Sequence, residues 1–243
     1  YDNGKLTLLK ECSDSVYVSF TNSALPLYPL TTKKFMVKSP ENFGKPNAAV
    51  SFSLSSSVRD FSMIVGVGGA TASSPVNFTV DFGDGNPVEY TATGNDLEHG
   101  TIVSGSRKGT GKVTVYMPEG YDITAFAIEN TRMLSCDFSA ARSLSLLTIR
   151  NCSLPRIDLT WNRCLSTLDL SGNSLTALDL STENGDYGKN VLSKIYASKN
   201  RISSIEFNNH RTPIVIDLSN NQLSEIPLKD MSNLRELSIA NNL

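Results

Sequence analysis

The sequence predicts a mainly β protein, in which an N-terminal antiparallel β-sandwich is followed by a short repeat solenoid of about six turns with little or no helix. Three observations favour this fold class. Residues 49–117 alternate apolar and polar side chains, turn-forming Gly, Pro, Asp and Ser separate the alternating runs, and the second half of the chain repeats one pattern at nearly fixed spacing. We expect the sandwich over residues 39–120 and the repeats over residues 121–243.

Residues 1–38 contain three short runs typical of strands, KLTLLK, SVYVSF and KKFMVKS. They either add strands to the sandwich or form a separate arm. The chain begins at Tyr1 without Met or a signal-like segment, so we expect a processed or trimmed piece of a longer precursor. A lipid anchor in the part that precedes Tyr1 is compatible with this expectation. At the other end, Leu243 comes before the sixth repeat is complete, and since a solenoid needs a polar cap we expect further sequence there.

The sandwich is predicted from five runs in which apolar residues recur at every second position, the period that places them on one face of a strand. Their apolar members are Val50/Phe52/Leu54, Phe61/Met63/Val65, Phe78/Val80/Phe82, Val88/Tyr90 and Val113/Val115/Met117. The pair Asp84-Gly85 separates the third run from the fourth and predicts a tight hairpin turn. Several short strands joined by such turns are typical of an antiparallel sandwich.

The hairpin run DFGDG at residues 81–85 and the closing strand GTGKVTVYM resemble the polycystic-kidney-disease-type (PKD) domain, an immunoglobulin-like sandwich common in secreted proteins. The sequence departs from that family at Val80, where an aromatic residue is usual, and it lacks the family's H-x-Y before the last strand. Asp81 and Asp84 do not have the ligand spacing of an EF-hand calcium loop. We interpret them as turn-stabilising residues, with calcium binding as the alternative.

The repeat pattern reads L-x-x-L-x-L-x-x-N-x-L and begins at residues 123, 144, 165, 192, 213 and 234. Its ninth position is held by Thr131, Cys152, Asn173, Asn200, Asn221 and Asn242, at intervals of 21, 21, 27, 21 and 21 residues. A period in this range indicates a solenoid, in which stacked turns bury the apolar face that no single turn can bury. We expect the ninth-position side chains to form a ladder that bonds backbone groups left unpaired at each turn.

This pattern resembles the leucine-rich repeat family, and the resemblance covers about the last half of the chain. A second apolar pair follows each ninth position, at Cys136/Phe138, Ile157/Leu159, Leu178/Leu180, Ile205/Phe207 and Ile226/Leu228. Each turn therefore reads as two extended segments without a helix, as in the short repeats of this family in bacterial surface proteins. A sandwich joined to such repeats is similar to an arrangement in exported bacterial surface proteins and adhesins.

The resemblance implies that a partner binds the concave face, formed by the outward residues of the first strand in each turn. Because neighbouring strands lie about 4.8 Å apart, Tyr196 should sit between Asp169 and Asp217. An aromatic side chain among charges of both signs is typical of a binding hot spot. The candidate partner-binding residues are Arg150, Asp169, Lys194, Tyr196, Lys199, Asp217 and Glu236. The alternative is that these residues only keep the face soluble.

Acidic residues occupy the middle of the second extended segment in four successive turns, at Asp137, Asp158, Asp179 and Glu206. Stacked carboxylates repel one another unless they are solvated or bridged by cations. We interpret them as solvated surface residues, with a ladder of metal ions as the alternative, and we predict no metal site. The single tryptophan, Trp161, follows the second of these segments and either packs over the turn or is exposed for contact.

Composition and motifs argue against several functional classes. A net charge of −2 and a pI of about 5.7 give no electrostatic reason to expect nucleic acid, and no apolar run approaches the ~18 residues of a membrane helix. His99 and His210 fall in different predicted domains, and no carboxylate pair or nucleophile–base set has a spacing that fixes a catalytic geometry. Cys136 and Cys152 are predicted to be buried thiols. We expect no enzyme activity, no catalytic residue and no cofactor.

These observations favour a monomeric, non-catalytic recognition or adhesion module of an exported bacterial surface protein, which binds a protein or glycan partner through the concave face of its repeats. The first alternative is a structural spacer that displays other parts of a larger surface protein. The second and less favoured alternative is an enzyme acting on glycans, which would need carboxylates converging from separate loops. Repeats of this architecture bind proteins, glycans and peptides, so the sequence does not name the ligand.

Overall fold

The computed structural model describes residues 15–20, 31–36, 47–181, 192–207, 213–228 and 231–243. These residues form strands, turns and bends, as predicted for a mainly β chain, and within those ranges nothing helical is long and apolar enough to cross a membrane. The chain divides into two compact units, residues 1–46 and 47–243. In the first, β1 (Ser15–Phe20) pairs antiparallel with β2 (Thr31–Met36), while the predicted KLTLLK strand lies outside the described residues.

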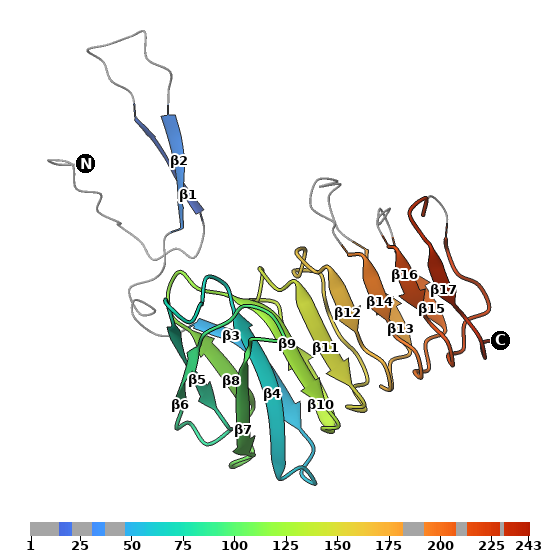
Figure 1. Ribbon diagram of the computed structural model, residues 1–243, viewed down its shortest axis with the longest axis horizontal. Coiled ribbons are helices and arrows are strands. Elements are labelled where there is room, and N and C mark those ends of the chain that lie inside the picture. The colour runs from blue at the N-terminus through green and yellow to red at the C-terminus, as the bar shows by residue number, and fades with distance from the viewer. Residues whose placement is uncertain (1–14, 21–30, 37–46, 182–191, 208–212, 229–230) are drawn as a thin grey trace, which may run out of the picture. The chain divides into compact units, whose positions relative to one another are not determined.

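The described residues of the second unit form three sheets (Figure 1). The five-stranded sheet has the order β10-β3-β8-β5-β6, from β3 (Asn47–Leu54), β5 (Val76–Asp81), β6 (Val88–Ala92), β8 (Val113–Met117) and β10 (Met133–Asp137). The eight-stranded sheet has the order β17-β16-β14-β12-β11-β9-β4-β7, from β4 (Asp60–Val67), β7 (Thr101–Ser106), β9 (Ile123–Glu129), β11 (Leu146–Arg150), β12 (Thr167–Asp169), β14 (Lys194–Tyr196), β16 (Val215–Asp217) and β17 (Glu236–Ser238). A small parallel sheet joins β13 (Ala177–Asp179) to β15 (Ser204–Glu206).

The solenoid is built on six parallel neighbours of the eight-stranded sheet, β9, β11, β12, β14, β16 and β17 (Figure 1). The register places the fourth residue of each repeat beside its counterpart in the next turn. In the first five repeats these residues are at most 1% exposed, and they are Phe126, Leu147, Leu168, Ile195 and Ile216. Six strands separated by five returns make a β-solenoid of about five turns, compared with the about six that the sequence predicts.

The eight-stranded sheet continues beyond the solenoid, because β4 pairs antiparallel with β9, and β7 with β4. On the opposite side, β3 pairs antiparallel with β10, the second extended segment of the first turn. Phe52 of β3 lies against Phe61 of β4 and Phe126 of β9, with ring centroids 5.9 and 6.1 Å apart. Residues assigned to the sandwich and residues assigned to the repeats therefore share hydrogen-bonded ladders and one hydrophobic core.

The alternating runs of residues 49–117 form the strands expected from them, and apart from β6 their apolar members are buried. In β6, Val88 is 39% exposed because this strand lies at the edge of its sheet. The sequence does not predict β7. Its run TIVSGS has a single inward apolar residue, Val103, and the exposed Ile102 breaks the alternation.

The second apolar pair of each turn faces the core, but not every pair belongs to a strand. The pairs that begin at Cys136, Leu178 and Ile205 lie in or beside β10, β13 and β15. The pairs at residues 157–159 and 226–228 lie outside any strand, although their side chains pack against the core. Burial is thus common to all the turns, whereas strand pairing on this side is not.

Buried or partly buried amide side chains join the later solenoid turns, each to the turn before it. Asn221 Oδ1 accepts a hydrogen bond from the N–H of Ile202, and its Nδ2 donates to the carbonyls of Ala197 in the preceding turn and Leu218 in its own. The other amides that bond both turns in this way are Asn173, Asn200 and Asn242. One side chain therefore satisfies buried groups of two turns at once.

The first two members of the ladder are not amides and make fewer bonds. Thr131 Oγ1 donates to the carbonyl of Glu129. Cys152 Sγ lies 3.6 and 3.0 Å from the carbonyl oxygens of Ile128 and Arg150, so its single S–H replaces only part of the donation that the two N–H groups of an amide provide.

The residue before each ladder position has a left-handed backbone, with φ between 52° and 73°. These residues are Asn130, Asn151, Gly172, Lys199, Asn220 and Asn241. Asn and Gly tolerate this conformation, which reverses the chain at the end of the strand. At Gly172 an added Cβ would lie 2.0 Å from Asn151 Oδ1, so the exposed Asn151 side chain would have to move.

We predict that Asn221→Ala lowers the free energy of unfolding by about 1–3 kcal/mol, because it leaves buried backbone groups of two turns without partners. The matched control is its exposed neighbour Asn220, where Asn220→Gly keeps the left-handed backbone and should change stability by less than about 0.5 kcal/mol. Urea unfolding of both variants measures the difference, and equal losses would contradict the role assigned to the ladder.

Candidate binding surface

The candidate surface is the outward face of the eight-stranded sheet, made by the side chains that alternate with the buried ones. The register places Tyr196 of β14 between Asp169 of β12 and Asp217 of β16. Tyr196 and Asp217 are half-buried, whereas Asp169 is 4% exposed. Three candidate residues of neighbouring strands thus lie side by side in one row.

Arg150 of β11 connects this row to the first turn of the solenoid. Its Nε donates to Asp169 Oδ2 at 2.7 Å, and its Nη1 lies 3.7 Å from Glu129 Oε1. The Asp169 side chain is only 6% exposed, whereas those of Arg150 and Glu129 are 49% and 46% exposed. Asp169 Oδ1 also accepts the N–H of Ser171, so the buried carboxylate is bonded through both oxygens. A buried carboxylate bonded in this way holds one end of the Arg150 side chain in place.

Of the other candidate residues, Lys194 lies near Tyr196 on the same strand, whereas Lys199 and Glu236 lie apart from this cluster. Lys194 is exposed on β14, in the outward row next to that of Tyr196. Lys199 is exposed at the left-handed position, past the end of the strand. Glu236 is exposed on β17 and pairs with Val215, so one strand separates it from Lys194.

Aspartates of both faces make a local turn that the sequence reasoning missed. In five Asp-x-Ser/Thr triplets, the Asp Oδ1 accepts the N–H of the third residue, with Asp137, Asp158, Asp169, Asp179 and Asp217 as acceptors. The hydrogen bonds from Ser139 and Thr160 lower the pKa of Asp137 and Asp158 below the ordinary value of 3.8. Among the described residues, no group of three or more His, Cys, Asp or Glu side chains could hold a metal ion.

The two aspartates of the β5–β6 hairpin, Asp81 and Asp84, bond to their own turn. Asp81 Oδ1 accepts the N–H groups of Gly83, Asp84 and Gly85, at 2.7 to 3.1 Å. Asp84 Oδ1 accepts the N–H of Asn86. Both carboxylates therefore have the turn-stabilising role that we favoured for them.

Burial keeps the core cysteines in the thiol form. It raises the pKa of Cys136 to about 12 and that of Cys152 to about 11. Neither thiol is therefore a nucleophile near neutral pH. Cys164 is a free, exposed cysteine, while Cys12 and His210 lie outside the described residues.

Trp161 is 43% exposed and lies beside the preceding turn. The guanidinium carbon of Arg142 is 4.4 Å from its ring centroid, a cation–π contact. Both alternatives considered for this residue thus hold in part, since the ring packs on a neighbouring turn and stays accessible.

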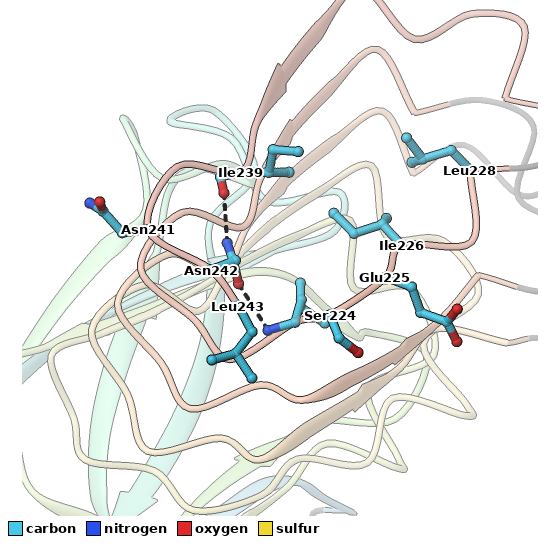
Figure 2. Close-up of a pocket in the computed structure, with 9 residues that line it drawn as sticks. Ser224, Glu225, Ile226, Leu228, Ile239, Asn241, Asn242 and Leu243 are labelled. Atoms are coloured by element: carbon cyan, nitrogen blue, oxygen red, sulfur yellow. Dashed lines mark hydrogen bonds between the residues drawn. The ribbon is translucent and has the colours of Figure 1, made fainter.

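Grooves among the described residues of the second unit include one at the last repeats and one along β4 and β9. The first, of about 450 Å³, is at the end of the solenoid and is lined by Leu223, Ser224, Glu225, Ile226, Leu228, Ile239, Asn241, Asn242 and Leu243. Figure 2 shows Ile226, Leu228 and Ile239 around it, with Asn242 Nδ2 donating to the carbonyl of Ile239. The second groove, of about 360 Å³, follows β4 and β9 on the outward face. The sequence predicts neither groove.

No protein-family model matches this chain, and none of the curated proteins compared with it matches either. The outward face brings Arg150, Asp169, Tyr196 and Asp217 together, and it leaves Lys199 and Glu236 at its margins.

We predict that Arg150→Ala lowers the free energy of unfolding by about 1–2 kcal/mol, because it removes the charged partner of the buried Asp169 carboxylate while Arg150 itself is half in solvent. The double variant Arg150→Ala/Asp169→Ser should recover part of this loss, since no unpaired charge remains. Urea unfolding of the full double-mutant cycle measures both effects. Additive losses would show that the two residues do not interact.

A second prediction concerns the loop of residues 94–100, which borders the outward face. The Asp96 carboxylate accepts a hydrogen bond from His99 Nδ1 at 3.1 Å and raises the pKa of His99 above its ordinary value of 6.5. The reciprocal contacts with His99 lower the pKa of Asp96 below 3.8. The stabilising contribution of His99 is complete below about pH 6.5 and is lost as the pH rises through its higher folded pKa.

Titration of the His99 imidazole by NMR measures this shift. Asp96→Asn removes the charge but keeps the shape of the side chain, and it should return the pKa of His99 towards 6.5. An unchanged titration curve in Asp96→Asn would contradict the assignment.

Proposed function

We propose that this chain is a non-catalytic recognition module that binds a protein or glycan partner through the outward face of its solenoid strands. The observation that carries the proposal is the row formed by Asp169, Tyr196 and Asp217, with Arg150 fixed beside it. An aromatic ring next to an arginine and carboxylates has the composition of a binding hot spot. Strand positions hold such side chains more firmly than loops do.

The repeats are proposed to be leucine-rich repeats of the short, helix-free kind. In support, parallel strands recur at the predicted spacing, and the amides of Asn173, Asn200, Asn221 and Asn242 bond successive turns. The residues before them are proposed to form a PKD-type sandwich. The antiparallel β5–β6 hairpin around DFGDG and the five-stranded sheet support this proposal.

The same resemblance leads us to propose an exported protein at a bacterial cell surface, present as a monomer. A structural spacer is the alternative, and it would need no binding row. An enzyme acting on glycans is less favoured, because the Asp169 carboxylate is occupied by Arg150 and Ser171, and those of Asp137, Asp158 and Asp217 each accept a local N–H.

The proposal is tested by applying the purified chain to arrays of glycans and of host extracellular proteins. We predict that the double variant Tyr196→Ala/Lys194→Ala loses about tenfold or more of the affinity for any ligand found, the loss typical of hot-spot truncation. The matched control is Tyr121→Ala/Lys112→Ala, which removes the same two residue types at exposed positions outside the solenoid strands.

A ligand that both variants bind equally well would move the site elsewhere in the chain. Absence of binding on both arrays would favour the spacer.

A further inference from the structure

The outward face of the solenoid strands continues without a break onto β4 and β7. Ile64 of β4 pairs with Ala127 of β9 on one side and with Ile102 of β7 on the other. These three residues share the outward face because Met63, Val103 and Ile128 beside them are at most 1% exposed on the core side. A partner on the repeat strands could thus extend its contact onto residues 60–64 and 101–106.

The groove along β4 and β9 lies on this extension. Its lining is Asp60, Phe61, Ser62, Met63, Ile64, Ala127, Ile128, Glu129, Asn130 and Thr131. A volume of about 360 Å³ is at the lower end of the range of ligand pockets, about 300–1,000 Å³, and suits one or two side chains of a partner. The small side chains of Ala127 and Ser62 leave this space open.

The two charged residues of this lining, Asp60 and Glu129, are both acidic. Asp60 accepts a hydrogen bond from the Ser106 hydroxyl, which is neutral, and no Lys or Arg within the described ranges forms an ion pair with it. The Glu129 side chain is 46% exposed, and its Oε1 lies 3.7 Å from Arg150 Nη1. Arg150 makes its shorter contact, 2.7 Å from Nε to Oδ2, with Asp169. The groove therefore presents negative charge to a ligand.

Apolar surface lies next to these carboxylates. Ile102 is 68% exposed, and the partly buried Ile64 lies beside it in the antiparallel register. Two neighbouring isoleucines on an outward face favour contact with an apolar side chain of a partner. A neutral glycan would leave both this patch and the two carboxylates without complementary groups.

We propose that this groove binds a polypeptide segment that carries a lysine or arginine next to an apolar residue. The cationic group pairs with Asp60 and Glu129, its aliphatic stem lies over Ala127, and the apolar side chain covers Ile64 and Ile102. This inference rests on the proposed function and adds to it the class of partner and a second contact area on the same face.

The test uses synthetic twelve-residue peptides with a Gly-Ser background and a central Ile-Lys, Ile-Arg, Ile-Glu or Ser-Lys pair. Each is titrated into the isotope-labelled chain, and NMR follows the signals of Ala127 and Ile102. We expect the Ile-Lys and Ile-Arg peptides to shift these signals and the other two to bind at least about fivefold more weakly. Equal shifts from the Ile-Glu peptide would overturn the inference.

Two surface variants locate the binding. Glu129→Gln keeps the side-chain shape and should weaken the Ile-Lys peptide about two- to fivefold, the effect of one exposed ion pair. Ile102→Ser should weaken it by about tenfold through lost apolar contact. The matched control is Tyr121→Ala/Lys112→Ala, at exposed positions that do not line the groove, which should leave peptide binding at the groove unchanged.

The outcomes separate the two proposals. Peptide binding that is lost only in Tyr196→Ala/Lys194→Ala would overturn the groove while supporting the repeat row. If the chain binds ligands on the arrays but no peptide shifts the NMR signals of Ala127 and Ile102, the groove proposal alone is overturned. If no ligand on the arrays and none of the peptides binds, both proposals are overturned.

Discussion

The structure depends on one constraint, which is that a solenoid turn cannot satisfy its own buried groups. Each turn contributes a short strand, a reversal and a return, and the reversal leaves backbone groups inside the molecule. The ladder amides supply the missing partners, as when Asn200 accepts the Leu175 N–H and donates to the carbonyls of Leu170 and Ala197. Because each amide bonds two turns, the turns are stable together rather than singly.

The same constraint explains how the residues before the repeats are used. The first turn needs a neighbour on its open side, and β4 and β3 provide one for β9 and β10. At the other end of the solenoid, Leu237 and Ile239 are 38% and 45% exposed, whereas their counterparts Ile216 and Leu218 are at most 1% exposed. The burial of a turn thus depends on its neighbours, and Figure 2 shows Ile239 beside the groove that Ile226 and Leu228 also line.

The elements that could be predicted from sequence are those whose pattern comes from burial. The alternation in residues 49–117 and the recurring Leu positions record which side chains face the core, so both gave correct strands. β7 was missed because Ile102 is apolar and yet faces outward, against the rule that was used to find strands. The groove on β4 and β9 was missed for a different reason, since antiparallel pairing across the predicted domain boundary has no periodic signal. Two local sequence signals were not used. The Asn or Gly before most ladder positions indicates a left-handed backbone, and the Asp-x-Ser/Thr triplets indicate local turns.

The shared sheet also bears on how a partner would be recognised. If the two predicted domains were joined only by a linker, each would present its own surface at a variable angle. Here Ala127 is bonded through its strand both to Thr148 of the repeats and to Ile64 before them, so the repeat row and the groove belong to one ladder. Side chains fixed on one ladder lose little conformational freedom when they bind. In the unbound chain, the distances between Tyr196, Arg150 and Glu129 are therefore already fixed by the sheet. This favours recognition of an extended segment that spans them over recognition of a single small group.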